Sequence, residues 1–105
     1  MDVVFEEEYL SELFEQGKSK NKKHAYQPQV IKKYIKVVNM LLAANRIEDL
    51  FPFNSLNYKK LNNSNRESVR IDGKYRLEFS SRIEGEEPHS ITICSLIELS
   101  NHYKK

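Results

Sequence analysis

The chain has 105 residues, 39% hydrophobic and 30% charged, with a net charge of +2. These values predict a single folded domain spanning residues 1–105, not a disordered or fibrous chain. No apolar run approaches the roughly 20 residues of a membrane helix, and the first residues lack a signal-peptide pattern, so we expect a cytoplasmic protein without a membrane partner. Cys94 is the only cysteine, which excludes an internal disulfide and favours a buried apolar role.

Charge is distributed unevenly along the chain. Residues 1–17 carry six acidic side chains and no Lys or Arg, residues 18–50 carry eight basic and two acidic ones, and residues 58–82 carry seven basic and three acidic ones. Two basic blocks within a nearly neutral chain favour an anionic partner, with nucleic acid first. The alternative is that both blocks are solvated surfaces.

The first half of the chain is predicted to form a strand and two helices. Residues 3–5 are a short apolar run typical of an edge strand. Residues 6–16 place Leu10, Leu13 and Phe14 at helical spacing, and Gly17 follows at the expected C-terminal cap. Pro28 suits the first turn of a second helix, over residues 28–45. Its apolar residues recur with a period of 3.6: Ile31, Tyr34, Ile35, Val38, Leu41 and Leu42.

The second half is predicted to be mainly β-structure. Residues 47–65 are irregular, with residues 56–61 as a candidate short strand. Residues 68–71 and 74–79 alternate polar and apolar side chains on either side of a turn, which predicts a β-hairpin. After a turn at residues 84–88, residues 90–99 are expected to form a central strand that is partly covered on both faces. The predicted order is β-α-α-β-β-β, an α+β fold.

The length of the hairpin loop decides which side chains share a face of the sheet. A two-residue loop would mix apolar and basic side chains on each face. A three-residue loop, residues 72–74, pairs Val69 with Leu77 on one face and Arg70 with Arg76 on the other. We prefer the three-residue loop because it separates the two classes. It predicts two adjacent arginines, which repel each other unless an anion lies between them.

No self-sufficient catalytic motif is present: the chain has no phosphate-binding loop, zinc-protease motif or nucleophile elbow. Its three histidines show no metal-ligand spacing, so we expect neither a metal nor a cofactor. Basic and aromatic side chains instead gather around the hairpin and at the end of the chain: Tyr58, Lys59, Lys60, Arg70, Lys74, Arg76 and Tyr103. Such a mixture can bind phosphates and stack on nucleobases. A solvated sheet surface is the alternative.

The hairpin, residues 68–79, resembles the central signature of the HigB branch of the RelE/ParE toxins, which contains Val-Arg, a glycine, an aromatic-Arg pair and a phenylalanine. The ending, residues 98–104, is similar to the C-terminal strand and tail of that family, and the opening strand with two helices matches its start. The similarity in order covers nearly the whole chain. It implies two N-terminal helices packed on a small antiparallel β-sheet.

The resemblance also implies a type II toxin-antitoxin system. The toxin would be a metal-independent endoribonuclease that cleaves mRNA on the ribosome, with the RNA 2′-OH as nucleophile. Its partner would be a cognate antitoxin, a DNA-binding helix-turn-helix protein. The protein must accept a proton, stabilise the extra negative charge and help the 5′-oxygen to leave.

The resemblance also implies a role for individual residues of the site. Arg70 and Arg76 match the family's hairpin arginines and would hold the scissile phosphate, because guanidinium groups bind oxygens in bidentate fashion. Lys60 corresponds approximately to a basic residue before the hairpin, as an acid/base or charge stabiliser. Tyr103 matches a tail aromatic that can stack or transfer a proton, with His102 beside it. The RNA-binding residues expected around this site are Tyr58, Lys59 and Lys74.

The chain departs from this family at one position, and two other functions remain open. The histidine of the family's His-x-x-Lys pattern falls on Asn57, which cannot serve as a general base. One alternative is a ParE-like toxin that binds DNA gyrase without catalysis, although the ending here lacks the arginine-rich tail of that class. The other is a toxin-like remnant that only binds its antitoxin.

Overall fold

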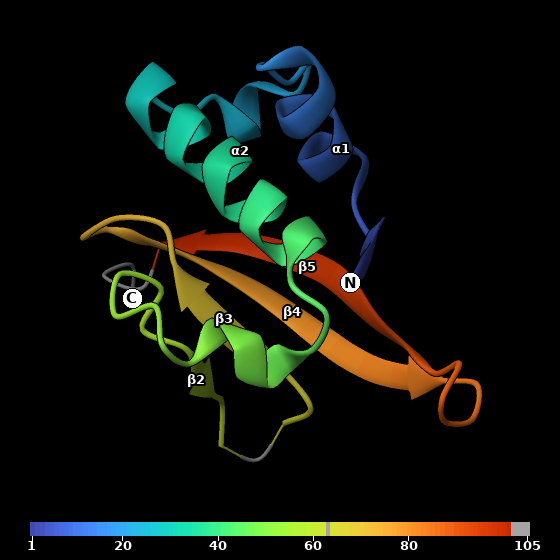
Figure 1. Cartoon of the computed structure of the whole chain (residues 1–105). Helices are drawn as coiled ribbons and strands as arrows, with labels where there is room; N and C mark the ends of the chain where they lie inside the picture. Colours follow the sequence, from blue (N-terminus) through green and yellow to red (C-terminus); the bar gives the residue numbers. More distant parts are fainter. Residues whose placement is uncertain (63, 102–105) are drawn as a thin grey trace.

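The computed structural model describes residues 1–62 and 64–101, and it is an α+β fold in two layers (Figure 1). The helices α1 (Glu8–Gln16) and α2 (Pro28–Ala43) lie over one face of a five-stranded sheet (Figure 1). The strands are β1 (Asp2–Phe5), β2 (Lys59–Lys60), β3 (Glu67–Arg70), β4 (Tyr75–Glu84) and β5 (Ile91–Asn101), in the spatial order β1-β5-β4-β3-β2. Short 3₁₀ helices span Lys22–His24 and Ile47–Leu50. None of the helices described is long and apolar enough to span a membrane.

The sheet is mixed, so the antiparallel sheet that the resemblance implied is wrong at one edge. β1 pairs with β5 in parallel, whereas the other three pairings are antiparallel. Parallel pairing is possible here because the strands are far apart in sequence and no tight turn joins them. The expected order β-α-α-β-β-β is also one strand short, because the candidate segment 56–61 contributes β2.

The helix signals near the chain start are largely confirmed. α1 begins two residues later than expected, at Glu8, and ends where predicted. Gly17 adopts a left-handed φ of 74° and its N–H donates to the Leu13 carbonyl at 3.1 Å, which closes the last turn. Leu10 and Leu13 are fully buried, whereas Phe14 is half-buried against the ring of Phe5 at 5.7 Å.

The buried stripe of helix α2 overlaps the one its apolar period predicted, because Tyr34, Val38 and Leu41 are buried as expected. Leu42 was expected inside but is 43% exposed, and Ile31 and Ile35 are only partly buried. The buried residues are Val30, Tyr34, Val37, Val38 and Leu41. Both sets are apolar, so the period alone could not identify the boundary of the buried stripe. Contact with α1 decides it: the buried Tyr34 hydroxyl donates to the Leu10 carbonyl at 2.7 Å.

The sheet side of the core matches the sequence prediction. The side chains of Val69, Ile71, Leu77 and Phe79 are all buried beneath the helices. Cys94 on β5 is buried as well, and burial raises the pKa of its thiol to about 12. A thiol in this environment stays protonated and is a packing residue.

The strands β4 and β5 form a hairpin that is longer than the sequence suggested. β4 continues to Glu84 and β5 to Asn101, whereas we expected them to end at residues 79 and 99. A register shift lies between Glu78 and Phe79, which pair with Glu98 and Leu96. This bulge lets Leu96 and Leu99 both face the core despite their odd spacing.

Candidate active site

The β3–β4 hairpin has the register that the parity argument predicted. Val69 pairs with Leu77 and Arg70 with Arg76, and the Ile71 N–H donates to the Tyr75 carbonyl at 3.0 Å. Val69 and Leu77 are fully buried under the helices. Because residues that pair across strands share a face, Arg70 and Arg76 lie together on the opposite, polar face.

The side chain of Asp72 holds the hairpin loop in place. Its Oδ1 accepts hydrogen bonds from the backbone N–H groups of Lys74 and Tyr75, each at 2.8 Å. An aspartate that bonds to the backbone two and three residues later stabilises a tight turn. The two arginines therefore lie on the strands that flank a loop of fixed shape.

Arg76 is tied to the protein by three hydrogen bonds. Its Nε donates to Ser68 Oγ at 2.9 Å, and its Nη2 donates to the carbonyls of Asn57 at 2.6 Å and Ser68 at 3.3 Å. The side chain thus crosses from β4 over β3 to the segment that precedes β2. Burial and the nearby charge of Arg70 lower the pKa of Arg76. Its guanidinium is held in one orientation, and no described residue accepts a hydrogen bond from its Nη1.

The side chain of Arg70 contrasts with the hydrogen-bonded side chain of Arg76. Its side chain is exposed, and its guanidinium makes no hydrogen bond or ion pair with residues 1–62 or 64–101. Its backbone N–H donates to the Leu56 carbonyl at 2.6 Å, which fixes the position of the residue. A positioned but unpaired guanidinium is suited to bind a phosphate.

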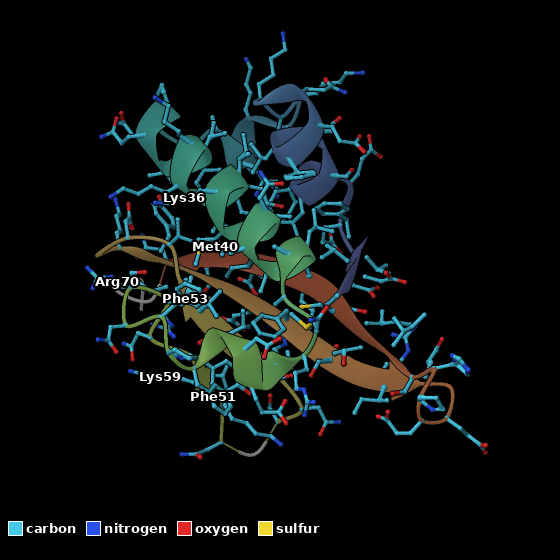
Figure 2. The ribbon with its side chains drawn as sticks, viewed as in Figure 1. Lys36, Met40, Phe51, Phe53, Lys59 and Arg70 are labelled. Atoms are coloured by element: carbon cyan, nitrogen blue, oxygen red, sulfur yellow. The ribbon has the colours of Figure 1, made fainter. Side chains whose placement is uncertain are left out.

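Arg70 also connects the two basic blocks of the sequence. It lines an open hollow of about 370 Å³ between α2 and the hairpin loop, together with Lys33 and Lys36 of α2. Figure 2 shows Lys36 and Arg70 on the same side of the molecule. The carboxylate of Asp72, which also lines the hollow, is already engaged by the backbone of its own loop. The fold therefore concentrates positive charge at this end of the sheet.

A third arginine, Arg66, is neutralised by two glutamates. The sequence did not predict these ion pairs. Its Nη1 contacts Glu78 Oε1 at 2.9 Å and Glu98 Oε1 at 3.2 Å. The hydrogen bond that Arg66 donates to Glu78 is the main reason that the pKa of Arg66 is raised. Glu78 and Glu98 face each other on β4 and β5. No sequence signal shows this ion pair network, because its members are far apart along the chain.

The two lysines of β2 face opposite sides of the sheet. Lys59 pairs with Ser68, whose side chain lies on the arginine face, whereas Lys60 pairs with Glu67, which points toward the helix side. Lys60 was expected beside the arginines, and by register it faces the other way. The physical reason is the alternation of strand side chains, in which a shift of one residue exchanges the two faces. Lys59 is the lysine that shares the arginine face.

Tyr58, expected to bind RNA, is held at the border of the core. Its hydroxyl donates to Glu67 Oε1 at 2.5 Å, and its ring lies 5.0 Å from that of Phe51 and 6.4 Å from that of Phe79. Burial and the bond to Glu67 raise the pKa of the Tyr58 hydroxyl. This hydroxyl is therefore already used within the protein.

The remaining predicted site residues are Lys74, in the hairpin loop, and His102 and Tyr103, near the end of the sequence. Lys74 is exposed in the loop, with its Nζ 5.7 Å from the centre of the Tyr75 ring. β5 ends at Asn101, opposite Tyr75. His102 and Tyr103 lie outside the described residues. Within the described part of the chain, no group of three or more His, Cys, Asp or Glu is placed to hold a metal ion.

Comparison of the chain with protein-family models gives no match, and comparison with curated proteins gives none either. The geometry of the residues is thus what a functional proposal can build on. It brings together Arg70, Arg76 and Lys59 on one face, whereas Lys60 faces the other side by register.

Proposed function

We propose that this chain is the toxin of a type II toxin-antitoxin system, a HigB-like member of the RelE/ParE superfamily. In this proposal it works in the cytoplasm as a metal-independent endoribonuclease that cleaves mRNA on the ribosome. A cognate antitoxin, a helix-turn-helix DNA-binding protein, neutralises it. The resemblance of residues 68–79 and 98–104 to that family suggests the activity.

One observation supports the proposal most: Arg70 and Arg76 are cross-strand partners, and no described carboxylate forms an ion pair with either of them. Two adjacent guanidinium groups repel each other, and the repulsion is relieved when an anion binds between them. Arg66, which has two carboxylate partners, shows that this sheet face can neutralise an arginine where no anion is needed.

The proposed reaction is a transesterification within the RNA. The 2′-OH loses its proton and attacks the adjacent phosphorus, and the P–O5′ bond breaks as the 5′-oxygen gains a proton. The products are a 2′,3′-cyclic phosphate and a 5′-hydroxyl end. Negative charge accumulates on the phosphate oxygens in the transition state, and charged donors that are already oriented stabilise it most.

We assign the roles from the geometry of the described side chains and, for the tail, from the resemblance. Arg76 is already oriented by its bonds to Ser68 and Asn57 and can donate to the phosphate through Nη1. Arg70 provides a free guanidinium. Lys59 adds positive charge on the same face. Asn57 stands where a histidine is expected, so we assign the proton transfers to His102 and Tyr103 of the tail, as the resemblance implies.

The decisive experiment is cleavage of an mRNA by the purified protein, with and without programmed ribosomes. We expect cuts within the codon in the decoding site, products with 5′-hydroxyl ends, and full activity of protein that is treated with EDTA and dialysed before it is added to the ribosomes. Expression of the chain alone should slow bacterial growth, and the antitoxin should restore it. Inhibition of gyrase supercoiling without any mRNA cleavage would instead support the ParE-like alternative, and absence of both activities would support an inactive remnant.

A further inference from the structure

Two phenylalanines between α2 and β2 are exposed although they are large and apolar. Phe51 is 54% and Phe53 49% exposed, with Pro52 between them. Residues on both sides of the pair are anchored in the core, because Leu50 and Leu56 are each 1% exposed. The Phe53 N–H donates to the Leu50 carbonyl at 3.1 Å, and the Leu56 N–H donates to the Phe53 carbonyl at 3.0 Å. The two rings thus project from a short, hydrogen-bonded segment.

The rings border an open hollow of about 340 Å³. Its lining consists of Phe51, Phe53, Asn54, Asn57 and Tyr58. The ring of Tyr58 supports Phe51 from inside at 5.0 Å and in turn approaches the buried ring of Phe79 at 6.4 Å. The rings of Phe79, Tyr58 and Phe51 therefore form a row from the core to the surface. The outermost ring, that of Phe51, is accessible to a planar ligand.

The hollow adjoins the arginine site through a shared residue. Asn57 lines the hollow, and its carbonyl oxygen accepts the hydrogen bond from Arg76 Nη2 at 2.6 Å. The preceding carbonyl, that of Leu56, accepts from the Arg70 N–H at 2.6 Å. Figure 2 shows Phe51, Phe53, Lys59 and Arg70 on one side of the molecule. The exposed aromatic rings and the arginine site are therefore linked through the backbone of residues 56–57.

We propose that Phe51 and Phe53 form a stacking platform for unpaired bases of the RNA strand whose phosphate Arg70 and Arg76 hold. This inference rests on the proposed function for its ligand. Single-stranded nucleic acid presents planar bases joined by phosphates, which matches aromatic rings next to guanidinium groups. A purely apolar peptide would leave these cations without partners, so charge complementarity favours RNA over such a peptide.

The platform predicts base binding without sequence preference, because every base has a stacking face. Phe53→Leu keeps an apolar side chain of similar size but removes the ring. We expect it to weaken the binding of single-stranded RNA by about tenfold, the loss of one stacked base. Phe53→Tyr keeps the ring and should bind as the unchanged protein does.

The test uses fluorescence, because the chain contains no Trp. Phe53→Trp places a single indole on the platform, and a short single-stranded RNA with 2′-O-methyl groups at every position serves as a probe that cannot be cleaved. Stacking of a base on the indole should quench its emission as the probe is added. Circular dichroism of each variant checks that the fold is retained.

Ile83→Ala is the matched control, because Ile83 is 71% exposed near the far end of β4. It should leave RNA affinity unchanged. The inference fails if Phe53→Leu and Phe51→Leu both bind the probe normally and the Phe53→Trp emission does not respond. Quenching by the antitoxin but not by RNA would overturn it in favour of a protein interface. Cleavage of unmodified mRNA is measured separately, so normal cleavage without a platform effect refutes only this inference.

Discussion

The hairpin end of the polar sheet face and the region around Arg66 both carry arginine, but in opposite electrostatic states. At the hairpin end, Arg70 and Arg76 are neighbours without a carboxylate partner among the described residues. Around Arg66, Glu78 and Glu98 approach the guanidinium from two strands. The comparison teaches that cross-strand partners decide which arginine is free to bind an anion.

A second difference lies within the hairpin end itself. Arg76 has three hydrogen bonds to the protein, whereas the guanidinium of Arg70 has none to the described residues. The sequence argument treated the two arginines as equivalent, since both were expected to hold the scissile phosphate. The hydrogen bonds of Arg76 to Ser68 and Asn57 indicate that it serves the fold as well as the site.

Replacing Arg76 is expected to have the largest effect. Arg76→Ala should lower cleavage by on the order of 100-fold, because an oriented donor to the phosphate is lost. It should also lower the free energy of unfolding by about 1–3 kcal/mol, since buried Ser68 loses its donor. Urea denaturation and a ribosome-dependent cleavage assay measure the two effects. Arg76→Lys is the control: it keeps the charge but cannot reach both Ser68 and Asn57. Unchanged stability in both variants would contradict the structural role.

Arg70→Ala separates activity from stability. We expect a loss of cleavage on the order of 100-fold with a change in unfolding free energy of less than about 0.5 kcal/mol, because the side chain is exposed. Arg66→Ala is the matched variant. It should retain cleavage and lose at most about 1 kcal/mol of stability, the range for exposed ion pairs. If Arg66→Ala were as inactive as Arg70→Ala, the distinction between free and paired arginines would be wrong.

The two lysines of β2 test the register. Lys59 shares the arginine face and Lys60 does not. Lys59→Ala should therefore weaken RNA binding and reduce the slope of log affinity against log salt by about one. Lys60→Ala should change neither quantity. Titrations of both variants over a series of salt concentrations give the answer, and the reverse result would show that Lys60 contacts the RNA.

The smallest expected effect comes from loosening the Arg66 network. Glu78→Gln removes one of the two carboxylates and leaves Glu98 as the partner of Arg66. We expect a loss of stability below about 1 kcal/mol and a modest gain in RNA affinity that disappears at high salt. Equilibrium binding at low and high salt measures this gain. Weaker RNA binding at low salt would mean that Glu78 itself supports the site.

Local patterns in the sequence predicted a substantial part of the fold. The left-handed cap at Gly17 and the buried residues of the hairpin follow from spacing and from strand parity. The pairing of Arg70 with Arg76 follows from the same parity, because a three-residue loop is the one that separates apolar from basic side chains. These features depend on residues within a few positions of one another.

Other features depend on contacts between distant segments. The buried face of α2 is decided by contact with α1, and the parallel pairing of β1 with β5 by strands from opposite ends of the chain. The neutral state of Arg66 needs two carboxylates on different strands. The partner strand alone decides that Lys59, and not Lys60, shares the arginine face.

The sequence by itself therefore determined the hairpin, its polar and apolar faces and the adjacent arginines, because the backbone geometry of a strand and a turn is a local property. The tertiary structure alone decided which basic side chains are available. Arg76 is tied to Asn57 while Arg70 remains free, and Phe51 and Phe53 border a hollow that Asn57 also lines. Both features depend on how the segment before β2 packs along β3. Hydrogen bonds and charge pairing act through space, so their partners cannot be read from neighbours along the chain.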